Sequence, residues 1–242
     1  MPTITIFRIE GKLGSLEEIV KRIDKKSFKE SWFVAKKSKF NKNEIFIQYF
    51  YYQKLEEVLR KVLGSEYAED VIGLLKVNGK VRVLKRVYCY INTLTKTLEV
   101  YRGPDKITRE IAEKLEKLLG IRLKRLKIKP EQLKQIYSNY SIELRQAFFE
   151  NINGLQMQVL KSRNLERNKL FELCIKKFLQ SLKAITFRPR IKSLNHNSKY
   201  YITINGDRGT IKFFPNGKFK WRPRFEIRQI LFAVANVIGL LR

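Results

Sequence analysis

The chain has 242 residues, of which 44% are hydrophobic and 12% aromatic, and this composition excludes a disordered tail because it is ample for a packed core. Lysine and arginine number 51 against 23 aspartates and glutamates, which gives a formal net charge of +28. An excess of this size attracts polyanions over long distances, so nucleic acid or an anionic membrane is the expected class of partner.

The first elements of the chain are a predicted strand and a predicted helix. Residues 3–9 alternate in period two between apolar and polar side chains, and Leu16, Ile19, Val20 and Ile23 follow at helical spacing. The N-terminal residues lack the apolar core and cleavage site of a signal peptide. We therefore expect an intracellular protein, cytoplasmic or associated with the nucleoid.

A plan of strand, turn, strand, helix and glycine occurs three times along the chain. Turn signals such as Asn-Gly separate the strands, and each helix ends close to a glycine. The copies cover residues 31–64, 76–120 and 199–239. Between the second and third copies, apolar residues at helical spacing predict a helical insert.

These elements predict an α+β fold, with antiparallel sheets covered by helices on one face and left open on the other. The expected divisions are an N-terminal α+β half (1–128), the helical insert (129–183) and a C-terminal half of hairpin and helix (184–242). The tandem units resemble in layout the saddle halves of TATA-binding-like proteins or paired RNA-recognition modules. The sequence contains neither an RNP-type signature nor another family motif.

Basic residues concentrate in the segments read as strands. Between residues 184 and 228 eleven basic side chains face only Asp207 and Glu226. Because neighbouring strand residues point to opposite faces, Ile211, Phe213, Phe219 and Trp221 should enter the core. The lysines and arginines between them should then form an outward basic plate.

The second copy repeats this arrangement with tyrosines. Alternation directs Val87, Cys89 and Ile91 inward and places arginines and tyrosines outward, while Lys85 breaks the pattern and predicts a β-bulge. Guanidinium groups contact phosphates, and flat rings stack on bases. The predicted nucleic-acid-binding residues are Arg82, Arg86, Tyr88, Tyr90, Tyr101, Arg188, Arg190, Lys212, Lys218, Lys220, Arg222 and Arg224.

Catalytic and cofactor motifs are not evident. The single histidine, His196, has no partners for a zinc site or a triad, and the four aspartates do not form a two-metal cluster. Cys89 and Cys174 are expected to be buried thiols. Without a phosphate-binding glycine motif, we predict a binding protein that uses no cofactor and no metal.

The primary hypothesis is a nucleic-acid-binding protein that contacts mainly the backbone, with duplex DNA favoured over RNA. Three alternatives remain open. The first is an RNA-binding protein or metal-independent ribonuclease. The second is a scaffold subunit or homo-oligomer, in which the basic plate binds an acidic protein partner or the helix predicted at 225–241 forms an interface. The third, ranked last, is a protein that binds an anionic membrane surface.

Overall fold

The fold is described from a computed structural model, for residues 3–39, 41–75, 81–152, 154–190, 200–214 and 224–240, with the side chains of residues 224–226 left aside. The N-terminal half consists of β1 (Thr3–Glu10), α1 (Leu16–Ile23), β2 (Ser27–Phe28), β3 (Ser31–Lys37), β4 (Glu44–Lys54), α2 (Leu55–Leu63), α3 (Ser65–Leu74), β5 (Arg82–Asn92), β6 (Thr97–Tyr101), α4 (Asp105–Leu119) and β7 (Arg122–Arg125). We call it the first half.

The second half begins with a helix and ends with one. It consists of α5 (Pro130–Tyr140), β8 (Ser141–Ile152), β9 (Leu155–Lys161), a 3₁₀ turn (Leu165–Arg167), α6 (Lys169–Phe178), a second 3₁₀ turn (Leu179–Ser181), β10 (Leu182–Pro189), β11 (Tyr201–Asn205), β12 (Thr210–Phe214) and α7 (Arg224–Val237). The predicted α+β class is confirmed.

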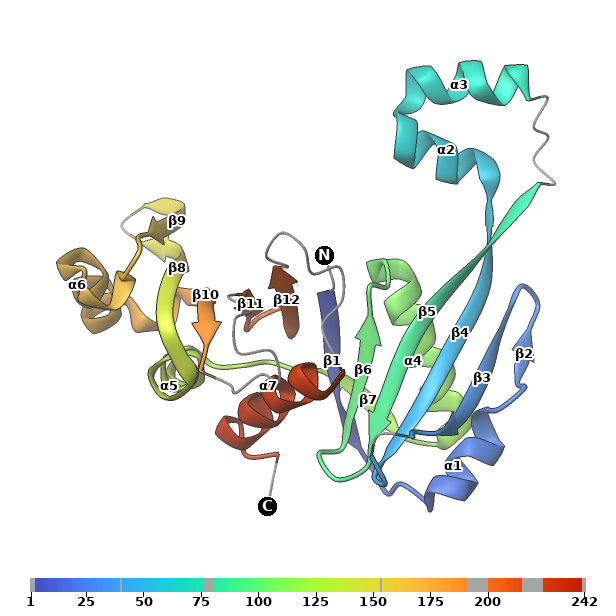
Figure 1. Ribbon diagram of the computed structural model, residues 1–242, viewed down its shortest axis with the longest axis horizontal. Coiled ribbons are helices and arrows are strands. Elements are labelled where there is room, and N and C mark those ends of the chain that lie inside the picture. The colour runs from blue at the N-terminus through green and yellow to red at the C-terminus, as the bar shows by residue number, and fades with distance from the viewer. Residues whose placement is uncertain are drawn as a thin grey trace.

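All described strands join one antiparallel sheet that runs through both halves (Figure 1). The order is β2-β3-β4-β5-β6-β1-β12-β11-β10-β8-β9, and β7 pairs with the C-terminal part of β1. Strand β1 therefore lies at the junction, with β6 on one side and β12 and β7 on the other.

Local signals in the sequence define the ends of several helices. Ser15 accepts a hydrogen bond from the amide of Glu18, whose carboxylate returns to the amide of Ser15, so a capping box opens α1. Helix α4 ends at Gly120, whose φ of 66° is the left-handed conformation that glycine adopts without strain. In the second half, Asn168 caps α6 through its side-chain oxygen.

The two halves have separate hydrophobic cores on opposite faces of the shared sheet. In β1, Phe7 and Ile9 join the core under α1 and α4, whereas Ile4 and Ile6 join the core under α5, α6 and α7. Residues of odd and even number in a strand point to opposite faces. Each half thus has helices on one face, as predicted, but the open faces of the two halves do not coincide.

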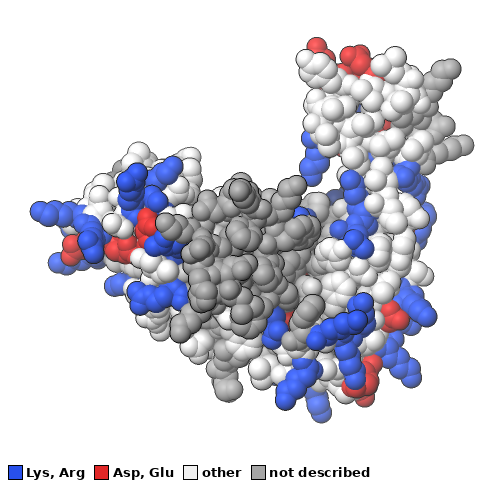
Figure 2. Space-filling model, in the orientation of Figure 1, with Lys and Arg blue, Asp and Glu red and all other residues white. Residues whose placement is uncertain are grey.

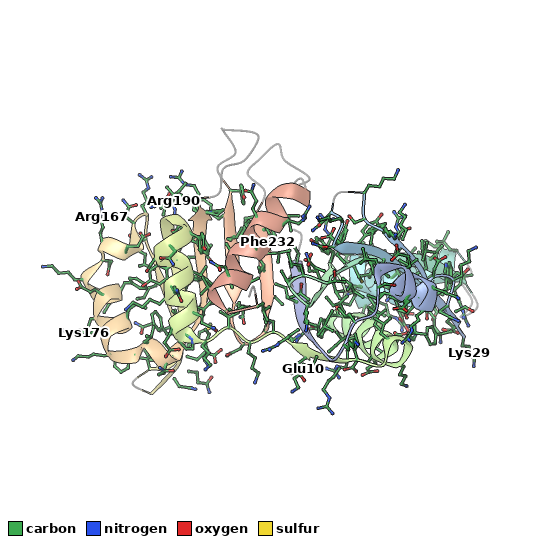
Figure 3. The ribbon with its side chains drawn as sticks, turned by 90° about the horizontal axis from the view of Figure 1, so that it is seen from below. Glu10, Lys29, Arg167, Lys176, Arg190 and Phe232 are labelled. Atoms are coloured by element: carbon green, nitrogen blue, oxygen red, sulfur yellow. The ribbon has the colours of Figure 1, made fainter. Side chains whose placement is uncertain are left out.

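The pairing register shows that each core face continues through the neighbouring strands of its half. Ile4 pairs with Ile211, and the same face continues through Ile204 and Ile185 in the second core. On the other side of β1, Phe7 pairs with Leu98 on the face of the first core. Figure 3, seen from below, shows α7 and α4 on opposite sides of the molecule.

The β-bulge predicted at Lys85 is absent from the structure. The pairing of β4 with β5 is continuous from Lys54 opposite Arg82 to Glu44 opposite Asn92, so there is no bulge at Lys85. Lys85 does share a face with Val87, but it lies beyond the part of the strand that the helices cover, where its side chain is only partly buried.

The predicted helical insert is only partly helical. Helices α5 and α6 are present, but β8 and β9 lie between them, and β8 pairs with β10 in the sheet of the second half. The strands and helices of the first two repeat copies are present, as are both strands that open the third. His196 lies outside the described residues, as does the Asn-Gly turn signal of the third copy at residues 216–217.

A helical arm stands apart from both cores. The arm comprises α2, α3 and Leu75, and it rises from the ends of β4 and β5, which continue beyond the helix-covered sheet as a two-stranded stalk (Figure 1). Ala68 is the only buried side chain of its two helices. Neither core contains a residue of the arm.

Both cysteines are buried free thiols, as expected, with Cys89 in the first core and Cys174 in the second. Burial, with a smaller contribution from Glu99, raises the pKa of the Cys89 thiol well above its ordinary range. Among the described residues, none of the helices has both the length and the apolar character that crossing a membrane requires.

Candidate nucleic-acid interface

The open face of the first half carries a group of aromatic side chains. They come from four adjacent strands and share one face because paired residues in an antiparallel sheet point the same way. The cross-strand pairs Trp32 with Phe50, Phe46 with Tyr90, and Tyr88 with Tyr101 place them together. We call the following set the aromatic face: Trp32, Phe46, Phe50, Tyr52, Tyr88, Tyr90 and Tyr101.

The rings of the aromatic face contact one another in two groups, one around Trp32 and one around Phe46, and Arg86 lies between the groups. Trp32 stacks on Phe50 with ring centroids 5.2 Å apart and planes 8° apart, and Phe46 lies 5.7 Å from Tyr88. Tyr90 meets Tyr101 edge to face at 5.4 Å. Six of the rings are partly buried and Tyr52 is exposed. These contacts hold a half-exposed aromatic surface in a defined arrangement.

Cations lie over these rings. The guanidinium carbon of Arg86 is 4.7 Å from the centroid of Tyr88 and 6.0 Å from that of Phe50, and the Lys36 ammonium is 5.7 Å from Phe46. Such cation–π contacts fix long side chains while leaving their charge available to a ligand. Arg82, on the same face, forms an ion pair of 2.5 Å with Glu30.

Helix α7 closes one end of the aromatic face over two buried carboxylates. Glu44 is 0% exposed and lies 3.8 Å from Arg228 of α7, and Ser38 donates a hydrogen bond of 3.0 Å to it. Glu99 is 3% exposed and accepts a hydrogen bond of 3.0 Å from the Tyr101 hydroxyl. Both carboxylates point to the same face as the rings, but burial removes them from the exposed surface.

The exposed part of the aromatic face is consequently positive or neutral. Figure 2 views the molecule from this side, and basic side chains outnumber acidic ones on the body of the first half. Gln48 and Val34 separate the rings and carry no charge. A surface of rings, arginine and lysine, on which the exposed Glu30 carboxylate is paired with Arg82, suits a planar anionic ligand.

The predicted residues of the second half do not join this surface. Lys212 lies on the opposite face of the sheet, with its ammonium 5.0 Å from the Phe214 ring. Arg188 is 3.9 Å from Glu143, which also pairs with Arg145 at 2.6 Å. The single basic plate predicted from the sequence is therefore wrong, because the two halves open to opposite sides.

The remaining predicted residues lie elsewhere. Arg190 is exposed and lines a cleft beside α5 and α6 together with Lys134 and Arg167; Figure 3 labels Arg167 and Arg190. Lys218, Lys220 and Arg222 lie outside the described residues, as do Phe219 and Trp221. Arg224 begins α7, and its side chain is not described.

A second polar cluster lies on the covered side of the first half. The Lys114 ammonium donates hydrogen bonds to Ser31 (2.7 Å), the Tyr49 hydroxyl (2.8 Å) and Glu110 (2.5 Å), and the Tyr49 hydroxyl donates to Glu110 at 2.6 Å. The ammonium also lies 4.6 Å from the centroid of the Phe28 ring. This network joins α4 to β3 and β4.

The electrostatics of this network are those of a structural ion pair. Burial and the hydrogen bond to Glu110 raise the pKa of Tyr49 far above its usual value. Burial alone would raise the pKa of Glu110, but the hydrogen bonds from Lys114 and Tyr49 outweigh it and hold that pKa below its ordinary value. The tyrosine is thus neutral and the carboxylate ionised at neutral pH.

Sequence reasoning found the tyrosines and arginines of β5 but missed half of the aromatic face. Trp32, Phe46, Phe50 and Tyr52 belong to it through β3 and β4, and Lys36 lies over Phe46. The signal was present, because Trp32 and Lys36 share one parity in their strand, as do Phe46 and Phe50 in theirs. The pairing of β4 with β5, which brings the two sets together, could not be read from that alternation.

Neither known protein families nor curated proteins include a match to this chain.

Proposed function

We propose that the protein binds nucleic acid through the aromatic face, with single strands preferred to duplexes. The observation that carries the proposal is the set of half-exposed rings held side by side on an open sheet, with Arg86 and Lys36 lying over them. Stacking of bases on aromatic rings needs unpaired bases, whereas a duplex presents mainly phosphates and groove edges.

Each group of the face has a role in this proposal. Bases stack on the exposed parts of the ring layer, Tyr88 among them, and Arg86, which lies over Phe50 and Tyr88, contacts the adjacent phosphate. Buried Glu44 and Glu99 do not repel the strand, because their charges lie beneath α7 and the ring layer. The hydrogen bond from Tyr101 to Glu99 fixes the ring orientation at that end.

The proposal is tested by fluorescence anisotropy with one 20-nucleotide sequence supplied as single-stranded DNA, single-stranded RNA and duplex DNA. The single strands should bind more tightly than the duplex, with affinity falling as salt rises. Comparison of the DNA and RNA samples tests the sequence-based expectation that DNA is favoured. Absence of binding at low salt, or equal binding of duplex and single strands, would refute the stacking proposal.

Two variants test whether nucleic acid binds at the aromatic face. Tyr88→Ala should weaken single-strand binding by roughly 5- to 150-fold, the range of one stacked base. Tyr67→Ala is the matched control, because Tyr67 is 69% exposed on the arm, far from the rings. If Tyr67→Ala weakened binding as much as Tyr88→Ala, the aromatic face would not be the site.

The alternative of a metal-independent ribonuclease can be tested in the same samples. The labelled RNA, incubated with protein in excess chelator and separated on a denaturing gel, should remain intact under the binding proposal. Cleavage that copurifies with the wild type and disappears in Tyr88→Ala would instead favour catalysis on the aromatic face.

A further inference from the structure

The arm exposes apolar side chains to an unusual extent. Of the fifteen large hydrophobic side chains that are exposed among the described residues, five belong to the arm. Leu74 is 83% exposed, Val62 73%, Tyr67 69%, Leu75 63% and Leu63 39%. Clustered apolar surface of this kind is typical of an interaction site, because isolated helices gain little stability by exposing it.

The arm is also the acidic part of a strongly basic protein. Residues 55–75 contain five carboxylates and two basic side chains, a net charge of −3, whereas the remainder of the chain has 49 basic and 18 acidic residues. Figure 2 shows the arm as a mainly uncharged surface with acidic side chains at its tip. A partner for the arm should therefore combine apolar surface with positive charge.

The same chain offers such a surface at its other end. Strand β9 is the edge of the sheet, and Leu155, Met157 and Val159 point to its open face with 55%, 64% and 42% of their surface exposed. Phe148 lies beside Val159, and Lys161 follows on the same face. We call these five residues the β9 patch.

The charge around the β9 patch is complementary to that of the arm. Lys161 and Arg163 are exposed, and no carboxylate among the described residues forms an ion pair with either. Lys212 lies on the same open face of the second half, and Glu150 opposite Met157 is the nearest acidic position in the hairpin. An uncovered apolar edge strand would otherwise be a site for uncontrolled pairing.

We infer that two copies of this chain form a reciprocal dimer in which the arm of each docks on the β9 patch of the other. The arm and the patch lie at opposite ends of the molecule (Figure 1), so two antiparallel copies can form both contacts at once and close with two-fold symmetry. Contact between two arms is disfavoured, because it would bring two acidic surfaces together.

The inference is tested by the molar mass of the full chain in solution, measured by light scattering and sedimentation after nuclease treatment, so that nucleic acid cannot bridge copies. The wild type should be a dimer that dissociates on dilution. Leu74→Ser with Leu75→Ser, and separately Met157→Ser with Val159→Ser, should each give monomers. Leu170→Ser with Leu173→Ser is the matched control, because these leucines are 50% and 44% exposed on α6.

A charge exchange makes the test specific for the pairing. Glu66→Lys with Asp70→Lys should weaken the dimer, as should Lys161→Glu with Arg163→Glu, and the four changes combined should restore it. A monomeric wild type overturns the inference. So does a dimer that survives the β9 substitutions, which would point to arm-to-arm contact, and so does a failure of the combined variant to recover. Circular dichroism confirms that each variant is folded.

Discussion

Lys114 is a basic residue that serves the interior of the protein and not its surface charge. Its side chain is 17% exposed, and its ammonium has three hydrogen-bond acceptors and lies near the rings of Phe28 and Tyr49. From the sequence, Lys114 is one of several charged positions on an amphipathic helix. Helical spacing does not indicate that β3 and β4 supply a serine and a tyrosine beneath it.

Replacement of Lys114 should therefore destabilise the fold. Lys114→Met leaves Ser31, Tyr49 and Glu110 without their shared donor, and a loss of about 1 to 3 kcal/mol in the free energy of unfolding is expected. Urea denaturation measures the effect. Lys117→Met, on the exposed side of the same helix, is the control and should change stability by less than about 0.5 kcal/mol.

Tyr49 should make stability sensitive to alkaline pH. Burial, together with the hydrogen bond to Glu110, raises its folded-state pKa, so its contribution is fully present below the unfolded pKa near about 10 and is lost as pH rises toward the folded-state pKa. Urea denaturation between about pH 9 and 11.5 should show this loss, and Tyr49→Phe should reduce the pH dependence. An identical profile for both proteins would contradict the assignment, since lysine titration is common to both.

At the scale of elements, alternation within a strand correctly predicts which side chains are buried. It does not predict which segments become strands or how the strands pair. Ile211 and Phe213 are 0% and 1% exposed, as their period-two spacing predicts, with Lys212 between them on the other face. Strands β8 and β9 were missed because apolar residues on either side supported helices. The predicted bulge at Lys85 is wrong because β5 continues as a regular strand beyond the part of the sheet that the helices cover. The sequence does not show where that cover ends.

The arm should be removable without loss of the fold. Because Lys54 pairs directly with Arg82, the chain between them can be replaced by Asn-Gly, which favours the tight turn of a two-residue hairpin. At a dilution where the wild type is monomeric, the melting temperature should change by less than about 4 °C, equivalent to about 1 kcal/mol for a chain of this size. A collapse of the thermal transition would show that the arm supports the cores.

At the scale of the whole molecule, the opposite placement of the helix layers decides which charges can act together. The sequence indicates which residues of a strand share a face, but not which face each set of helices covers. That choice is made by the connections before α1 and α5 and by the way β1 divides its apolar residues between two cores. A net charge of +28 therefore suggested one plate where there are two separate surfaces.

A pair of charge reversals distinguishes one plate from two surfaces. Arg86→Glu should weaken single-strand binding by at least about ten-fold and reduce the slope of log affinity against log salt by about 0.7 for each phosphate that the variant no longer neutralises. Lys212→Glu changes the net charge equally but lies on the opposite face, so it should have a much smaller effect. If salt titrations showed that both variants bind equally weakly, the hypothesis of a single basic plate would be supported instead.

The position of β1 also has a consequence for the order in which the chain is made. Synthesis begins with this strand, yet one of its three pairing partners, β12, arrives about two hundred residues later. Until then Ile4 and Ile6 belong to a core whose other members have not been translated. A nascent chain stalled before Thr210 should therefore display an adhesive strand edge, and the ribosome-bound intermediate should depend on chaperones more than its compact first half would suggest.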